Sequence, residues 1–114
     1  MRIAARTMGT VAVAGALLFG GVVATAPSAA AVGSERCTKN DADHWRTITD
    51  LGVAPIRSGP AQGYSVRYTM EFAQHFRAEC STVNRHGNTW FYGKGEFRST
   101  KGWIYGARTE KGHF

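Results

Sequence analysis

Strict alternation of apolar and polar residues marks the segment SVRYTMEF, residues 65–72. Successive side chains of an extended chain point to opposite faces, so this pattern predicts a half-buried β-strand. Its apolar face would consist of Val66, Tyr68, Met70 and Phe72. Its polar face would consist of Ser65, Arg67, Thr69 and Glu71.

A second alternating segment, QHFRAECSTV, follows at residues 74–83. Its predicted apolar face consists of Phe76, Ala78 and Cys80. The next residues, NRHGN, place Gly87 among polar side chains, as in a hairpin turn. The segments TWFYGKG and KGWIYG continue the strand-like pattern on either side of a loop at residues 95–100. Because no helical spacing is sustained after Asp50, we predict an all-β fold, a small antiparallel barrel or sandwich.

The beginning of the chain has the pattern of a secretory signal peptide. Arg2 and Arg6 form a short basic start, residues 8–24 are apolar and uncharged, and small residues follow at positions 29–31. The apolar stretch is shorter than the roughly 20 residues of a membrane-spanning helix, so an uncleaved anchor is the weaker alternative. We therefore expect a signal peptide at residues 1–31, a flexible N-terminal arm at 32–46 and one domain at 47–114.

Cys37 and Cys80 are the two cysteines of the chain. In a small exported protein, such an even pair predicts a disulfide. The bond would close a loop of 44 residues. By restricting the unfolded chain it would stabilise the fold by roughly 4 kcal/mol, which is comparable to the net stability of a marginal small domain.

Charge refines this picture only slightly. The chain carries 14 Lys and Arg against 8 Asp and Glu, and loss of Arg2 and Arg6 with the signal peptide would leave a net charge of +4. Charges of both signs alternate along the chain instead of clustering, which argues against a nucleic-acid groove. We expect a secreted monomer, extracellular or associated with the cell wall, with no nucleic-acid partner and no stable membrane insertion.

Three motifs occur in an order typical of one bacterial family. The segment IRSGPAQGYSV begins at Ile56, GNTWFY at Gly87 and GWIY at Gly102. They resemble the turn and the two tryptophan-bearing strands of bacterial Src homology 3-like domains, over residues 48–109. The chain is most similar to small secreted members in which a cysteine near the start pairs with one in the central strand. The resemblance implies a five-stranded antiparallel barrel, with Gly93 where the family usually has an aliphatic residue.

The same resemblance places Phe91 and Ile104 inside the barrel. Alternation then puts the neighbouring aromatic side chains on the outer or groove face. These are Trp90, Tyr92, Trp103 and Tyr105, joined by Tyr64. A soluble monomer seldom exposes such an apolar patch unless it binds a partner there, so we interpret the patch as a ligand-binding surface. The alternative is a second core, in which residues 32–45 cover the rings.

Arg57 follows the apolar residue Ile56 and should therefore point outward. It is either a solvated side chain or a ligand-facing group at the mouth of the barrel, where it could meet a carboxylate.

Catalytic chemistry has little support in the sequence. No ligand spacing relates the four histidines, His44, His75, His86 and His113. A disulfide would remove both thiols as nucleophiles. No recognisable base accompanies the serines Ser58, Ser65, Ser81 and Ser99. We therefore expect no enzyme activity, no cofactor and no metal site.

Three functions remain open at this point. The first is a secreted, non-catalytic binding module that docks cell-wall peptide or peptidoglycan in an aromatic groove. The second is a small extracellular protein-binding effector or inhibitor, and the third is an accessory structural domain whose aromatic residues are all core. The predicted ligand-binding residues are Arg57, Tyr64, Trp90, Tyr92, Trp103 and Tyr105.

Overall fold

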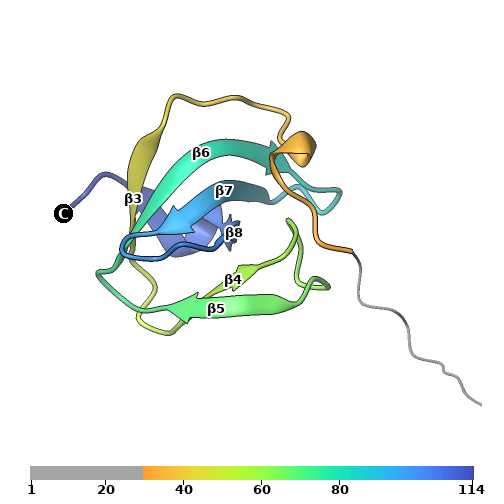
Figure 1. Ribbon diagram of the computed structural model, residues 1–114. Helices are drawn as coiled ribbons and strands as arrows, with labels where there is room; N and C mark the ends of the chain where they lie inside the picture. Colours follow the sequence, from red (N-terminus) through yellow and green to blue (C-terminus); the bar gives the residue numbers. More distant parts are fainter. Residues whose placement is uncertain (1–29) are drawn as a thin grey trace, which may run out of the picture.

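The segments with alternating residues form antiparallel strands in the computed structural model, which describes residues 30–114 (Figure 1). All but the last two residues of the predicted signal peptide, 1–31, lie outside the described residues. The strands are β3 (His44–Ile48), β4 (Ala54–Arg57), β5 (Val66–Met70), β6 (His75–Val83), β7 (Thr89–Gly95), β8 (Lys101–Tyr105) and β9 (Thr109–Lys111). Two short 3₁₀ turns are η2 (Ser34–Arg36) and η3 (Gly106–Arg108). The described part of the chain contains no helix with the length and apolarity to cross a membrane.

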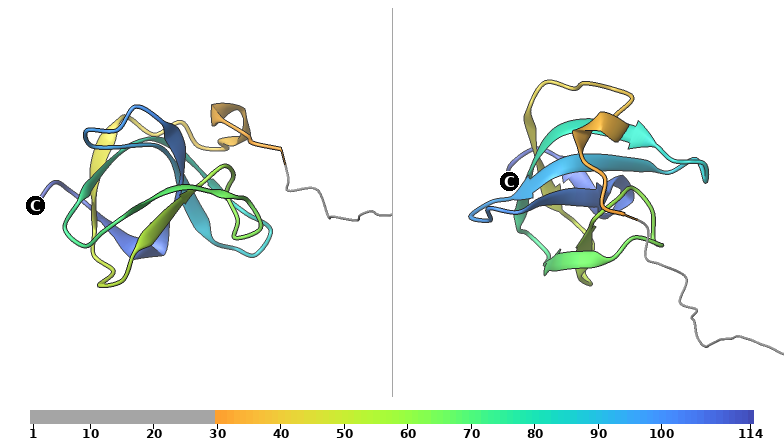
Figure 2. Two further views of the ribbon diagram at one scale, coloured as in Figure 1. Left: turned by 60° about the horizontal axis from the view of Figure 1, so that its bottom comes forward. Right: turned by 45° about the vertical axis from the view of Figure 1, so that its right-hand side comes forward.

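The seven strands form one sheet in the order β5-β4-β8-β7-β6-β3-β9. The sheet curls until the loop after β5 reaches β3, where Ala73 N donates to Ile48 O at 2.9 Å and Ile48 N donates to Gln74 O at 2.8 Å (Figure 2). Strands β5 and β9 remain its edges within the described residues, so the sheet is open. The all-β prediction is confirmed, but the sheet has seven strands instead of five. The two additional strands were not predicted. Strand β3 begins inside the predicted arm, 32–46, and β9 has three residues, so both are too short to show a long alternating pattern.

The inner face of the curled sheet carries the main hydrophobic core. Ile104 is fully buried there and Phe91 packs against it, as predicted. Val66 and Phe72, which were predicted to lie on the apolar face of a half-buried strand, are 47% and 53% exposed. They flank the part of edge strand β5 that faces the core, and β5 ends before Phe72. The core consists of Ile48, Ala54, Ile56, Met70, Phe76, Ala78 and Ile104.

A β-bulge in β6 changes the face on which its side chains lie. The pairing of β6 with β7 shifts register between Ala78 and Cys80. Ala78 belongs to the main core, whereas Cys80 pairs with Tyr92 on the opposite face. The prediction that Cys80 shares a face with Phe76 and Ala78 is therefore wrong, because a bulge adds one residue to one strand and reverses the alternation beyond it.

Gly93 lies on β7 directly opposite this irregularity, paired with Ala78. A Cβ atom at Gly93 would lie 1.9 Å from the carbonyl oxygen of Arg77 and 3.0 Å from the Cα atom of Ala78. The two backbones approach so closely that no side chain fits between them. This approach explains a glycine where the family resemblance suggests an aliphatic residue.

The arm (residues 32–43) is attached to β6 by a covalent bond and by backbone hydrogen bonds. The predicted disulfide between Cys37 and Cys80 is confirmed, with Cα atoms 5.9 Å apart. Further along, Ser81 N donates to Lys39 O at 2.9 Å and Lys39 N donates to Ser81 O at 3.0 Å. The arm therefore lies along the outer side of the sheet.

Candidate ligand-binding site

Two aromatic pairs lie on the outer face of β7 and β8. The register sets Trp90 opposite Tyr105 and Tyr92 opposite Trp103. The ring centroids are 5.4 Å apart in the first pair and 5.1 Å apart in the second. All four predicted aromatic residues therefore share one face of the sheet, as their alternation indicates.

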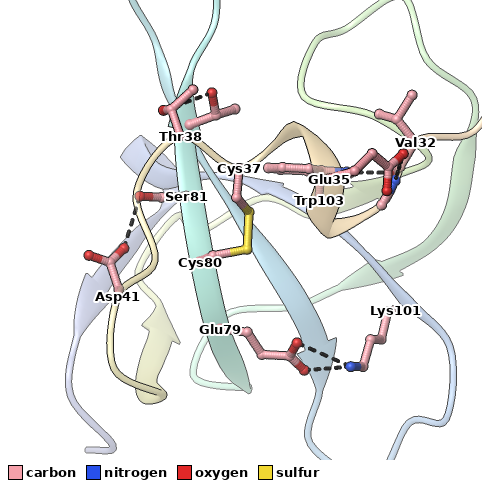
Figure 3. The surroundings of a disulfide bond; sticks show 12 residues. Val32, Glu35, Cys37, Thr38, Asp41, Glu79, Cys80, Ser81, Lys101 and Trp103 are labelled. Carbon is pink, nitrogen blue, oxygen red and sulfur yellow. Dashed lines mark hydrogen bonds and ion pairs between the residues drawn. A yellow bond between two sulfur atoms is a disulfide. The ribbon is translucent and has the colours of Figure 1, made fainter.

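The arm covers the Tyr92–Trp103 pair. Trp103 Nε1 donates to Val32 O at 2.8 Å (Figure 3). Val32 N in turn donates to Ser58 O at 2.9 Å. As a result, Trp103 has no exposed surface. Trp103 lies on the predicted outer face but is not available to a ligand, so the alternative of a second core under residues 32–45 holds for Trp103.

Trp90 is also buried, at 3% exposure, so the expectation that its ring is exposed on this outer face is wrong as well. Its surroundings are different, because its ring borders two surface hollows together with Tyr105 and Gln62. The indole Nε1 is shielded from solvent and has no hydrogen-bond acceptor within residues 30–114. A buried donor without an acceptor costs about 1–3 kcal/mol and is rare in folded proteins. Trp90 thus carries an unsatisfied donor beside a hollow.

A groove runs between the loop at residues 60–64 and the β6–β7 turn at residues 84–88. Asn84 Nδ2 donates to Pro60 O at 2.9 Å and ties the two loops together. Three hollows of about 710, 370 and 20 Å³ form the groove, and consecutive hollows share lining residues. We call it the loop groove: the two loops are its walls, and the Trp90–Tyr105 pair lies at its base.

The loop groove is positively charged. None of the described residues that line it carries a carboxylate. Arg36 and Arg85 are exposed at its largest hollow. Arg108 borders the smallest hollow, where its charge is balanced by an ion pair with Asp50 at 2.6 Å. An anionic ligand would therefore meet no like charge in the groove.

Arg57 shapes the loop that forms one wall of the groove. Its Nη1 atom donates to the carbonyl oxygens of Gln62 and Tyr64, at 3.1 and 2.9 Å. The side chain is half-buried and borders the smallest hollow. Arg57 is thus held by backbone carbonyls, an arrangement that neither sequence-based alternative included.

The structure brings four of the six predicted binding residues to the loop groove, namely Arg57, Tyr64, Trp90 and Tyr105. Tyr92 and Trp103 do not line it, because the arm lies beside them. Sequence reasoning missed the polar wall residues Gln62, Asn84 and Asn88. The turn that contains the two asparagines was predicted. Its position opposite residues 60–64 depends on the order of strands in the sheet, which local patterns do not reveal.

A second cleft, of about 590 Å³, lies between the arm and β3. In it the guanidinium carbon of Arg46 lies 4.0 Å from the centroid of the Phe91 ring, and burial lowers the pKa of Arg46. Its Nε atom already donates to Thr109 Oγ1 at 2.7 Å. Asp41 and Asp43 line the same cleft, so its charge is mixed. The loop groove is the stronger candidate site.

No protein-family model matches the chain, and comparisons with curated proteins and with solved structures find no match. The loop groove is therefore the feature of this chain that points to a function.

Proposed function

We propose that the protein is a secreted, non-catalytic module that binds an extended, anionic peptide, of the kind found in cell-wall stem peptides, in the loop groove. The observation that carries this proposal is the unsatisfied indole N–H of Trp90 at the base of the groove. A carbonyl oxygen of a bound peptide would supply the missing acceptor. Because the Nε1 atom is buried, the side chains around it must shift before that contact can form, and the exposed Gln62 borders the same hollows.

Aromatic and charged groups around this donor support a peptide ligand. Tyr64 and Tyr105 are half-buried on the groove and offer flat apolar surface that loses little entropy when it binds. Arg36 and Arg85 add positive charge in a groove without carboxylates. Free carboxylates of a stem peptide complement that charge and would speed association.

The disulfide supports a secreted protein, because such bonds persist in oxidising compartments. Attachment to the cell wall would follow from the ligand itself.

We also propose that the sheet is an extended form of a Src homology 3-like barrel. The three motifs fall, in order, on β4 with its following turn, on β7 and on β8. Strands β4 to β8 form one contiguous block in the sheet and provide the five strands of such a barrel. Strands β3 and β9 then extend the block at one edge.

Co-sedimentation of the purified protein with isolated peptidoglycan tests this function. Trp90→Phe removes the indole N–H and should lower the bound fraction at least tenfold. Phe97→Ala is the matched aromatic control, since Phe97 is 97% exposed in the β7–β8 loop, and it should bind normally. Arg85→Glu should weaken binding, whereas the same charge change at the exposed residue Lys94 should have less effect.

Competition identifies the ligand class. Soluble stem peptides should release the protein from the wall, whereas glycan strands without peptide should not. A folded protein that fails to co-sediment would end the wall-binding proposal. Capture of an extracellular protein through the same groove, unaffected by wall fragments, would support the protein-binding alternative.

A further inference from the structure

Two histidines and one glutamate converge at the opposite end of β6 from the loop groove. His75 begins β6, Glu96 follows β7, and His113 lies beyond β9. One ligand atom from each side chain lies within 4.8 Å of the other two. The nine-residue strand β6 separates this cluster from the groove by about 26 Å, at roughly 3.3 Å per residue.

The sheet itself brings these distant residues together. Thr47 on β3 pairs with His75 on one side and with Glu110, close to His113, on the other. Glu96 N donates to His75 O at 2.8 Å, which fixes the carboxylate beside the imidazole. His75 and His113 have no ligand spacing in the sequence, yet their ring centroids lie 3.6 Å apart in a stacked arrangement.

The hydrogen bonds of His75 indicate a cation. Its Nε2 atom lies 3.1 Å from Phe114 O, and its Nδ1 atom lies 3.0 Å from Glu96 Oε1. Both partners are acceptors, but a neutral imidazole has one N–H group. Nε2 can donate to Phe114 O, which leaves the lone pair of Nδ1 facing a carboxylate. A positive charge, either a second proton or a metal ion, is needed between those two atoms.

The two distances from Glu96 fit a metal ion, and one imidazole must turn out of the stacked arrangement for both nitrogen lone pairs to point at that ion. His113 Nε2 lies 3.4 Å from the same Glu96 Oε1 atom that approaches His75 at 3.0 Å. In a tetrahedral zinc site with bonds of about 2.0–2.1 Å, neighbouring ligand atoms lie about 3.3 Å apart. The bond from His75 Nε2 to a backbone carbonyl is the outer contact that orients most zinc-binding histidines. We propose that His75, Glu96 and His113 form a binding site for a divalent zinc ion.

Such a site would bind the segment that follows β9 to the rest of the sheet. Glu96 and His75 lie on adjoining elements, whereas His113 comes from the segment after the edge strand β9. The side chains are 18%, 27% and 45% exposed for His75, Glu96 and His113, so an ion can enter from solvent. Three protein ligands leave one coordination position for water.

Isothermal titration of the untagged, chelator-treated protein with zinc chloride tests this site. We expect one zinc ion per chain and a higher melting temperature with zinc. His113→Asn and Glu96→Gln should each weaken binding at least tenfold, while circular dichroism confirms that both variants fold. His86→Asn is the matched control, because His86 lies exposed in the β6–β7 turn, and it should bind zinc normally. Affinity should also fall on acidification, since protons compete for the ligand atoms.

Absence of saturable zinc binding by the folded protein would overturn the proposal. Undiminished binding by both His113→Asn and Glu96→Gln would also overturn it. A loss confined to His86→Asn would place the ion elsewhere.

Discussion

The indole Nε1 of Trp103 donates a 2.8 Å hydrogen bond to the carbonyl oxygen of Val32. This contact joins the first residue of the arm to the middle of β8, 71 positions away in the sequence. It divides the outer aromatic residues into two sets with different roles. The Tyr92–Trp103 pair is covered by the arm and stabilises the fold. The Trp90–Tyr105 pair borders the loop groove, and Trp90 carries an unsatisfied donor.

The two tryptophans should respond differently to the same substitution. Trp103→Phe and Trp90→Phe both remove ring volume, but the first also leaves Val32 O without its donor, whereas the second removes an unsatisfied N–H. Trp103→Phe should therefore be the more destabilising change, by about 1–3 kcal/mol. Urea denaturation of both variants measures the difference. Equal free energies of unfolding would contradict the assigned hydrogen bonding.

The disulfide should supply a large part of the stability. Its two cysteines are separated by 43 positions. The double change Cys37→Ser and Cys80→Ser should lower the free energy of unfolding by roughly 4 kcal/mol, because the unfolded chain regains its entropy. A reducing agent should destabilise the natural protein similarly and leave the double variant unaffected. A variant that unfolds at the same urea concentration as the natural protein would contradict this expectation.

Gly93 should tolerate no side chain. Gly93→Ala places a Cβ atom 1.9 Å from Arg77 O, so the bulge must open, at a cost on the order of 3 kcal/mol or more. Gly63→Ala is the matched control, because a Cβ atom there meets no described atom within 4 Å. The control should change stability by less than about 0.5 kcal/mol. Thermal unfolding compares the two, and similar melting temperatures would show that the backbones do not approach as described.

Local patterns predict much of this fold. The motif resemblance placed Phe91 and Ile104 on the inner face, and alternation then placed the four neighbouring aromatic residues on the outer face. The pairing of Cys37 with Cys80 followed from their number in a small exported chain. These features depend on residues close in sequence or on simple counting.

The remaining features depend on contacts between distant segments. Alternation cannot show where it reverses, so the bulge before Cys80 was missed. It cannot show which outer surface another segment covers, so the burial of Trp103 by Val32 was left as an alternative. His75 and His113 become neighbours only because β3 pairs with both β6 and β9.

Tyr68 should make the protein less stable at alkaline pH. Burial raises the pKa of Tyr68 above its ordinary value of 10.0, and its hydroxyl donates to Thr100 O at 2.9 Å while it accepts from Gly95 N at 3.0 Å. The folded state favours the protonated phenol. The contribution of Tyr68 to the free energy of unfolding is therefore fully present below pH 10 and is lost as the pH rises through the raised pKa. The hydrogen bond that Lys101 Nζ donates to Glu79 also raises the pKa of Lys101, which adds to the fall in the same direction.

Urea denaturation at pH 8, 10 and 11 measures this dependence, because these values span the range in which phenols ionise. Tyr68→Phe should be less stable by about 1 kcal/mol at pH 8, having lost its hydrogen bonds, and should lose less stability between pH 10 and 11. An equally steep loss in this variant would assign the alkaline transition to other groups.

The central claim is that Trp90 donates its indole N–H to a peptide bound in the loop groove. The most direct measurement is the nuclear magnetic resonance signal of each indole N–H, assigned with the two Trp→Phe variants, during titration with a soluble stem peptide. The Trp90 signal should move and saturate, while that of Trp103, bonded to Val32, should stay in place. A Trp90 signal that remains fixed while the peptide binds would contradict the claim.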